Sequence, residues 1–184
     1  DALPICKTLT IEKSSEGTSW GAVYAQFMQP TKSVEASASG LTVTRELISP
    51  SGSTVSEPAE STVSEPVEST VAEPVEAKVG DRVKMRITII ADRDYDFVQV
   101  IDRRAACMEP VRQLSGYTQG AYCTPKDCST NYYIDMLSKG KHVIETEYYI
   151  DRTGTYETGL CTVSCAYAPE FRGTAKSITI EVKK

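Results

Sequence analysis

The sequence predicts an all-β protein folded as an antiparallel β-sandwich. Three observations support this prediction: apolar residues recur with a period of two, short strand-like stretches alternate with polar turns, and no stretch shows a capped amphipathic helical pattern. Residues 82–91 show the alternation clearly, with apolar side chains at Val83, Met85, Ile87 and Ile89. Such alternation is typical of a strand with one buried face, and roughly nine such strands favour two packed sheets.

Each expected strand is rich in β-branched or aromatic residues and lies between turn signals. The expected strands are residues 5–12, 19–28, the stretch around Leu41 and Val43, 82–91, 96–103, 131–137, 142–151, 158–167 and the stretch from Ile178 to Val182. The turn signals are Gly17, Val79-Gly80-Asp81, Ser115-Gly116, Lys139-Gly140-Lys141 and Thr153-Gly154. We therefore expect one immunoglobulin-like domain over residues 1–184.

Residues 53–76 form a tandem repeat of eight residues: STVSEPAE, STVSEPVE and STVAEPVE. Each unit carries one proline, two glutamates and little apolar surface, so burial would not offset the entropy of ordering it. The recurring proline also interrupts ladder hydrogen bonds. We expect residues 53–76 to be an exposed, extended loop between the third strand and the fourth, and we expect the domain to tolerate its removal.

Composition excludes several classes of protein. The chain has 184 residues, of which 40% are hydrophobic, so it is not disordered throughout. Its formal charge is -5, but the repeat holds six glutamates and no basic residue, and the rest carries 20 basic and 19 acidic side chains. A nearly neutral folded part argues against a nucleic-acid footprint or a membrane-surface patch. No apolar run approaches the length of a membrane span, about 18 residues, and we expect a soluble piece, matured or cut from a longer chain.

Two groups of residues could suggest catalysis or metal binding. His142 is the only histidine, and no nucleophile or orienting acid is placed beside it in the sequence, so we expect an exposed residue at a strand entry. The run Asp92-Arg93-Asp94-Tyr95-Asp96 resembles an acidic calcium loop, but Phe97 and Arg103 stand where that loop needs glycine and glutamate. We expect no catalytic residue, no cofactor and no metal.

Six cysteines are the strongest signal outside the strand periodicity: Cys6, Cys107, Cys123, Cys128, Cys161 and Cys165. A zinc site would use Cys123 with Cys128 and Cys161 with Cys165, but two residues four apart in a strand have Cα atoms about 13 Å apart. Disulfides between strands, and with them an oxidising compartment, are therefore favoured. Fifteen full pairings exist, and spacing does not choose among them. The alternative is that several are buried thiols of a cytosolic domain.

Several segments resemble the C-terminal part of bacterial alpha-2-macroglobulins. They are ADRDYDFVQVIDRRAACMEPV from Ala91, CAYAPEFRG from Cys165, SWGAVYAQF from Ser19 and LTVTREL from Leu41. The resemblance implies a macroglobulin-like β-sandwich that follows a thioester domain. In that family a bait segment is cleaved, the molecule rearranges and the protease is trapped.

The resemblance implies no catalytic role for this chain. A thioester needs a cysteine followed three positions later by glutamine, and the residues at that distance here are Leu9, Pro110, Lys126, Asn131, Ser164 and Ala168. The family also suggests a disulfide between Cys107 and Cys165. That leaves Cys161 for Cys123 or Cys128, with a local bond between Cys123 and Cys128 as the alternative. Cys6 would be unpaired or bonded to the remaining loop cysteine.

The resemblance implies a non-enzymatic structural and interaction domain of a broad-spectrum protease inhibitor of the periplasm or cell envelope. Its expected partners are neighbouring domains of the same long chain, including a thioester domain, and, indirectly, target proteases. The alternative is an immunoglobulin-like binding or stalk module of a bacterial surface adhesin. A small zinc or cysteine enzyme is disfavoured by the single histidine and the spacing of the cysteines.

Overall fold

The computed structural model describes residues 10–21, 28–50, 54–56 and 74–184, with only the backbone described at 54–56. The described part is almost entirely β, with one short 3-10 turn, η1 (Thr31–Ser33). None of the helices described is long and apolar enough to cross a membrane. The strands are β1 (Ser37–Ser39), β2 (Leu41–Ile48), β3 (Thr54–Ser56), β4 (Val75–Lys78), β5 (Arg82–Ala91), β6 (Tyr95–Arg103), β7 (Met108–Pro110), β8 (Gly116–Thr118), β9 (Ala121–Pro125), β10 (Ser129–Leu137), β11 (Gly140–Ile150), β12 (Gly154–Glu157), β13 (Cys161–Cys165), β14 (Arg172–Ala175) and β15 (Thr179–Lys183).

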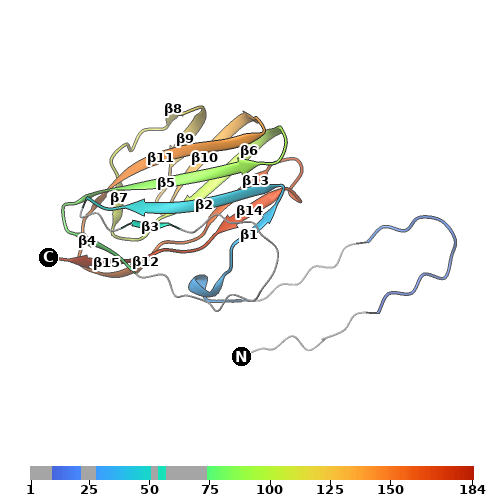
Figure 1. The fold of residues 1–184 in the computed structure, drawn as a ribbon, viewed down its shortest axis with the longest axis horizontal. Coiled ribbons are helices and arrows are strands. Elements are labelled where there is room, and N and C mark those ends of the chain that lie inside the picture. The colour runs from blue at the N-terminus through green and yellow to red at the C-terminus, as the bar shows by residue number, and fades with distance from the viewer. Residues whose placement is uncertain (1–9, 22–27, 51–53, 57–73) are drawn as a thin grey trace.

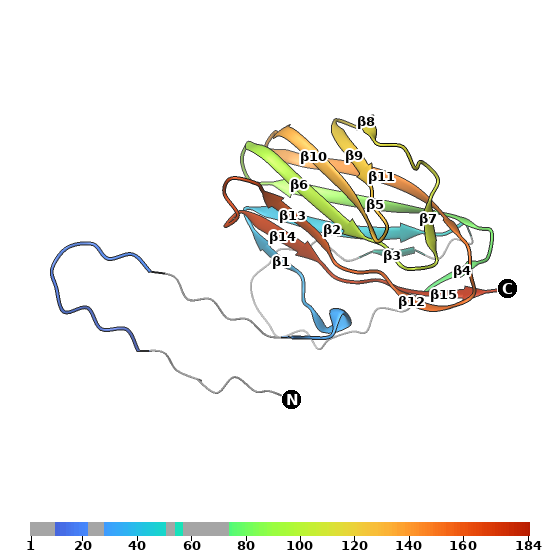
Figure 2. The ribbon, with the colours of Figure 1, turned by 180° about the vertical axis from the view of Figure 1, so that it is seen from behind.

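The predicted antiparallel β-sandwich is confirmed. One continuous sheet runs in the order β7-β11-β5-β2-β1-β14-β13-β6-β10-β9-β8, with β3 paired to β2. The sheet folds over on itself, so that β11, β5 and β2 form one layer and β13, β6 and β10 form the other (Figure 1; Figure 2 from behind). The short strand β1 pairs with β2 and with β14 and so joins the two layers.

Alternation of apolar residues produces the core between the layers. Every second residue of β2 and β5 is buried, and β6 and β13 bury their inward residues in the same way. Two buried tyrosines span the core, and their hydroxyls are satisfied by threonines of the facing layer. Thr130 on β10 lies 2.8 Å from the Tyr148 hydroxyl on β11, and Tyr132 on β10 bonds Thr146 on β11.

A second, three-stranded sheet of order β12-β15-β4 lies at the end of the sandwich where the chain terminates (Figure 1). Strand β4 pairs with β15 in parallel, through Val75 opposite Ile180 and Val182 opposite Ala77. Val75, Ala77 and Ile180 are almost wholly buried. Residues far apart in the sequence therefore close this end of the core.

The structure corrects the bounds of the repeat loop. Residues 54–56 form β3, and the last residues of the third repeat unit begin β4, where Val75 is fully buried. An exposed loop over the whole of 53–76 is therefore wrong at both ends. Residues 57–73 lie outside the described part of the chain.

The two N-terminal strands expected at 5–12 and 19–28 are also wrong wherever the chain is described. Residues 10–12, 19–21 and 28 carry no strand, and Trp20 and Met28 are almost completely exposed. The remaining residues of these two stretches lie outside the described part. The expected strand at 158–167 is shorter than predicted, because Thr158 and Gly159 lie in a connection and the strand ends at Cys165.

Candidate functional site: an aromatic cluster at one end of the sandwich

Two segments that are remote in the sequence meet at one end of the sandwich. They are residues 91–97, which run from the end of β5 into β6, and residues 165–173, which run from the end of β13 into β14. Their register brings them together, because Cys165 pairs with Val98. The tight β1–β2 hairpin at Gly40 lies at the same place, since Asp92 donates its backbone N–H to the Gly40 carbonyl at 3.2 Å.

The inner part of the cluster is a packed pair of rings. The rings of Tyr95 and Phe171 lie 5.3 Å apart and tilted by 56°, and the Arg93 guanidinium lies 5.2 Å from the Phe171 ring centre. Gly40 has a φ of +75°, and a Cβ there would lie 2.2 Å from the Tyr95 hydroxyl oxygen. The hairpin thus requires glycine both for its backbone conformation and for the approach of Tyr95.

The outer part of the cluster is exposed. Phe97 and Tyr167 contact edge to face, with ring centres 5.3 Å apart and planes at 88°, a favourable aromatic geometry. Phe97 is 52% exposed and Tyr167 is 82% exposed. The strand expected at 158–167 ends at Cys165, and Tyr167 lies in the turn that follows.

Backbone contacts hold this exposed pair in place. Phe97 has a φ of +53°, which is rare for a bulky residue and is costly unless the surroundings enforce it. The Ala166 N–H donates to the Phe97 carbonyl at 2.9 Å, and the Phe171 N–H donates to the Ala168 carbonyl at 3.0 Å. The Cys165 thiol donates to the Asp96 carbonyl at 3.1 Å. The two rings therefore project from a fixed backbone.

The acidic run beside Phe97 serves the fold of this end. Asp92 accepts a hydrogen bond from the Tyr95 hydroxyl at 2.5 Å and pairs with the Arg93 guanidinium at 3.0 Å. The Arg93 and Tyr95 hydrogen bonds lower the pKa of the Asp92 carboxyl to about 2. Asp94 accepts the Lys139 backbone N–H at 2.7 Å. Within the described residues, no group of three or more His, Cys, Asp or Glu side chains could hold a metal ion.

A buried ion pair, which the sequence analysis missed, lies deeper in the sandwich. Arg45 on β2 and Asp102 on β6 are 3% and 0% exposed, and their Nη1 and Oδ1 atoms lie 2.8 Å apart across the two layers. The guanidinium also donates to one hydroxyl and three carbonyl oxygens, those of Thr158 (2.9 Å), Arg103 (3.1 Å), Gly159 (2.5 Å) and Lys176 (2.6 Å). Arg45 thereby ties both layers to the connections around β12 and β15.

The electrostatics of this pair follow from its burial. Desolvation raises the pKa of the Asp102 carboxyl, and the Arg45 charge opposes the shift. The Arg45 Nε and Asp102 Oδ2 atoms have no hydrogen-bond partner in the described part. Both residues lie at inward positions of strands in which every second residue is buried. Arg45 lies between the buried Val43 and Leu47, and Asp102 is the next buried position after Val100. Opposite charges at two such positions were a signal in the sequence for an ion pair across the core.

The structure places four cysteines in the interior and one at the surface. Cys107, Cys123, Cys161 and Cys165 are buried and Cys128 is exposed, and the five sulfurs are unbonded; Cys6 lies outside the described residues. Burial raises the pKa of the Cys107 thiol to about 11 and that of Cys161 well above its usual range.

The register disfavours two of the expected disulfides, Cys107 with Cys165 and Cys161 with Cys123. Cys161 lies opposite Asp102, and Cys165 lies opposite Val98, so about 13 Å of strand separates Cys165 from the end of β6 that leads to Cys107. The order of the sheet places β6 and β10 between Cys161 on β13 and Cys123 on β9. A disulfide needs Cα atoms within about 7 Å. The bonds of Cys128 with Cys123 or with Cys161 are not affected by this argument and stay predictions.

His142 lies on β11 opposite Ile89 and is half-buried. Its Nε2 lies 2.7 Å from the Ser138 carbonyl oxygen, to which it donates when that nitrogen carries the proton. The described contacts of His142 therefore tie it to its own turn rather than to a nucleophile.

Comparison with known proteins agrees with this architecture. The profile of the bacterial alpha-2-macroglobulin MG10 domain matches residues 40–170, which include both segments of the aromatic cluster except the last three residues of the second. No curated protein matches the chain.

Three solved structures illustrate the likeness of fold. The Salmonella alpha-2-macroglobulin reacted with methylamine has a TM-score of 0.62 at 20% identity, over 84% of this chain and 10% of that one. A native Escherichia coli alpha-2-macroglobulin fragment from domain MG7 to the C-terminus has a TM-score of 0.63 at 15% identity, over 84% and 25%. The trypsin-activated Escherichia coli protein has a TM-score of 0.61 at 16% identity, over 82% and 11%. The chain thus spans about a tenth of the Salmonella protein.

Proposed function

Because this chain belongs to the bacterial alpha-2-macroglobulin family, we propose that it is a non-catalytic interaction domain of a broad-spectrum protease inhibitor. The domain acts mechanically, as a rigid sandwich that docks against neighbouring domains of the same long chain. One of these neighbours is a domain that bears a thioester, which the sandwich helps to hold or release. Proteases are then partners of the whole inhibitor and only indirect partners of this domain.

The observation that carries the proposal is the exposed Phe97–Tyr167 pair. Aromatic residues that project from a preorganised backbone contribute strongly to binding, because little conformational entropy is lost when they are covered. Here the Phe97 carbonyl is bonded to the Ala166 N–H, and the two rings already contact each other. We therefore assign docking to this end of the sandwich.

The chemistry of the cysteines supports a non-catalytic role. The six cysteines lack a glutamine three positions later, so this chain cannot form a thioester of the kind found in the family. Burial raises the pKa values of the Cys107, Cys123 and Cys161 thiols, which lowers the fraction of reactive thiolate. Covalent capture of a protease, where it occurs, is thus assigned to another domain.

The proposed location is the bacterial periplasm or the cell envelope. This location permits disulfides, and non-reducing peptide mapping of material made under oxidising conditions tests it. A bond of Cys128 with Cys123 or with Cys161 is expected. Six free thiols would contradict the proposed compartment.

The runner-up, a stalk or binding module of an adhesin, is less well supported. A stalk would leave the domain at one end, whereas the repeat starts with the residues of β3 and ends with the first residues of β4, two strands of the same fold. We keep the family function as the conclusion.

Binding to an adjoining domain tests the proposal. The 184-residue chain is titrated by calorimetry with the thioester-bearing domain of its own parent protein, and binding is expected to weaken at least tenfold in Tyr167→Ala. Leu114→Ala is the matched control, because Leu114 is 79% exposed, close to the 82% of Tyr167, but lies away from the cluster. Undiminished binding of Tyr167→Ala, or an equal loss in Leu114→Ala, would refute docking through this end.

A further inference from the structure

The outer face of the layer β1-β14-β13-β6-β10-β9-β8 carries mainly hydroxyl, amide and phenol side chains. Directly paired residues of neighbouring strands share a face, so the register defines two adjacent rows across this layer. The first row is Ser39, Arg172, Ser164, Gln99, Tyr133, Tyr122 and Tyr117. The second row is Ser37, Thr174, Thr162, Ile101, Asn131 and Thr124. Together they cross seven strands, a width of roughly 29 Å at the usual strand spacing.

The two rows contain hydroxyl, amide and phenol groups and one charged side chain, Arg172. Two further charged residues, Arg103 and Asp135, lie two positions outside the rows on β6 and β10. The outer face of the opposite layer is different, because charged residues pair across β2, β5 and β11. Those pairs include Lys84 with Glu145 at 3.0 Å and Arg86 with Glu46 at 3.2 Å.

Tyrosines dominate one end of the rows. Tyr117, Tyr122 and Tyr133 lie side by side on β8, β9 and β10 and are 71%, 38% and 41% exposed. The rings of Tyr117 and Tyr122 are 5.2 Å apart at 68°, and Gln99 donates a long hydrogen bond of 3.4 Å to the Tyr133 hydroxyl. This end offers apolar ring surfaces edged by hydroxyl groups.

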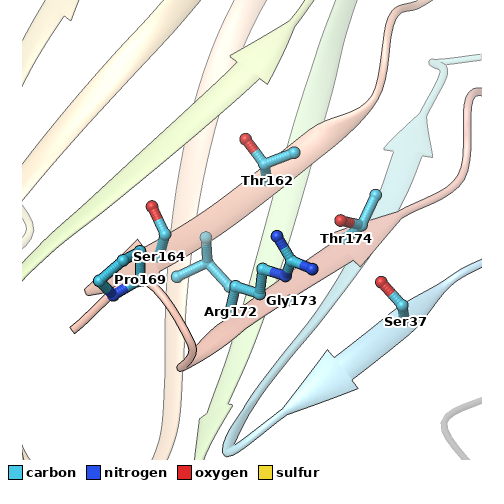
Figure 3. A pocket seen from close by; sticks show the side chains of 8 residues that line it. Ser37, Thr162, Ser164, Pro169, Arg172, Gly173 and Thr174 are labelled. Atoms are coloured by element: carbon cyan, nitrogen blue, oxygen red, sulfur yellow. The ribbon is translucent and has the colours of Figure 1, made fainter. Parts of the chain in front are cut away.

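The other end of the rows is hollowed. A depression of about 460 Å³ is lined by four hydroxyl-bearing residues of β1, β13 and β14, by Arg172, and by Val163, Pro169 and Gly173. Figure 3 shows that Thr162 and Ser164 on β13, Thr174 on β14 and Ser37 on β1 point to the same side of the sheet. These hydroxyls can each donate and accept a hydrogen bond.

From this arrangement we infer that the face binds an extended, uncharged polysaccharide. The rows carry a single charge, that of Arg172, which gives the face little attraction for an ionic partner, so a neutral partner fits it better. A sugar presents hydroxyl groups to the Ser, Thr, Asn and Gln side chains and apolar C–H surfaces to the tyrosine rings. A protein partner is less favoured, because hydroxyl and amide side chains outnumber the three tyrosines and Ile101 in the rows, and each would need a matched hydrogen bond in the dry core of a protein interface.

Affinity electrophoresis of the 184-residue chain tests the inference. The gels contain hydroxyethyl cellulose, dextran or galactomannan, three neutral polysaccharides, and at least one is expected to retard the chain. The retardation should persist in 1 M sodium chloride, because the contacts are not ionic. The variant Tyr122→Ala/Tyr133→Ala should lower the association constant at least tenfold. Gln99→Glu, which keeps the rings and places a charge in the middle of the first row, should lower it as well.

Tyr149→Ala is the matched control, because Tyr149 is 38% exposed, like Tyr122, but lies on the outer face of the other layer. It should bind as the unaltered chain does, and all variants should show a single cooperative thermal transition. Lack of retardation by all three polysaccharides would overturn the inference. Loss of retardation in salt, or an equal loss in Tyr149→Ala, would overturn it too. So would variants that lose only binding to an adjoining protein domain, because the face would then belong to a protein partner.

Discussion

Arg45 connects parts of the sandwich that no strand pairing connects. Its guanidinium reaches Asp102 in the opposite layer and the carbonyl oxygens of Gly159 and Lys176 beside the small sheet. A buried pair of this kind contributes little relative to a well-packed apolar pair, but its rupture leaves an uncompensated charge in the core. We therefore expect Arg45 to specify how the small sheet sits against the large one.

Replacement of Arg45 should destabilise the fold strongly. We expect Arg45→Met to lower the free energy of unfolding by about 3–5 kcal/mol, because Asp102 and three carbonyl oxygens lose their partner. Arg86→Met is the control: Arg86 pairs with Glu46 and Glu145 at the half-exposed surface, where such pairs contribute about 0–1 kcal/mol. Urea denaturation measures both changes, and an Arg45→Met loss no larger than the Arg86→Met loss would contradict the proposed role.

Asp92 should make stability depend on pH in acid. Its pKa is lowered to about 2 in the folded chain, below the value of about 3.9 for an unfolded chain. Its contribution is therefore fully present above pH 4 and is lost as the pH falls from about 4 to about 2. The stability difference between the unaltered chain and Asp92→Asn should shrink over this window in chemical denaturation. A difference that is constant from pH 5 to pH 2 would show that the Arg93 and Tyr95 contacts do not act in solution.

At the scale of elements, the alternation of apolar residues predicted the long strands. It failed for strands that form only because they pair with a distant strand. Strand β5 has the predicted bounds, 82–91, because every second residue is apolar and buried. Strand β4 begins within an EPVE stretch, residues 73–76, that the middle repeat unit also carries at 65–68, and it pairs with β15, more than a hundred residues away. Such remote pairing leaves no mark in the local sequence. The aromatic cluster was present in the recognised segments, but its geometry depends on the turn after Cys165, which periodicity does not describe.

The EPVE sequence occurs in both the middle and the third repeat unit, so its valine can be replaced in each unit and the two effects compared. Val75→Ala should lower the free energy of unfolding by about 1.5–3 kcal/mol, because Val75 is fully buried. Val67→Ala changes the equivalent residue of the middle unit, where we expect less than about 0.5 kcal/mol. Thermal or urea denaturation compares the two. Equal losses would mean that the middle unit is packed as closely as the third.

Deletion of the middle unit, residues 61–68, tests the expectation that it is dispensable. It leaves the residues of β3 and β4 intact and shortens the connection from 17 to 9 residues between 56 and 74. Halving a loop changes the closure entropy by only about 0.6 kcal/mol. We expect a melting temperature within a few degrees of the full chain, about 2–4 °C per kcal/mol for a chain of this length. A fall of more than about 10 °C would show that the unit contributes packing.

At the scale of the whole molecule, the features of the sandwich are divided between its ends and faces. The small sheet and the C-terminus lie at one end (Figure 1), and the aromatic cluster lies at the β1–β2 hairpin, the start of β6 and the end of β13. The outer face with paired charges belongs to β2, β5 and β11, and the opposite layer carries the two rows, in which Arg172 is the one charged side chain. This division fits a domain that is covered by other domains over part of its surface only.

Photo-crosslinking in the intact parent protein tests the central claim, docking through the Phe97–Tyr167 end, most directly. Tyr167 is replaced by p-benzoylphenylalanine, the protein is irradiated, and the crosslinked peptides are identified by mass spectrometry. Because Tyr167 is 82% exposed in this chain, we predict a crosslink within the same polypeptide to a peptide of another domain. Crosslinks confined to residues 37–184, or no crosslink above that of the same label at Leu114, would contradict the account.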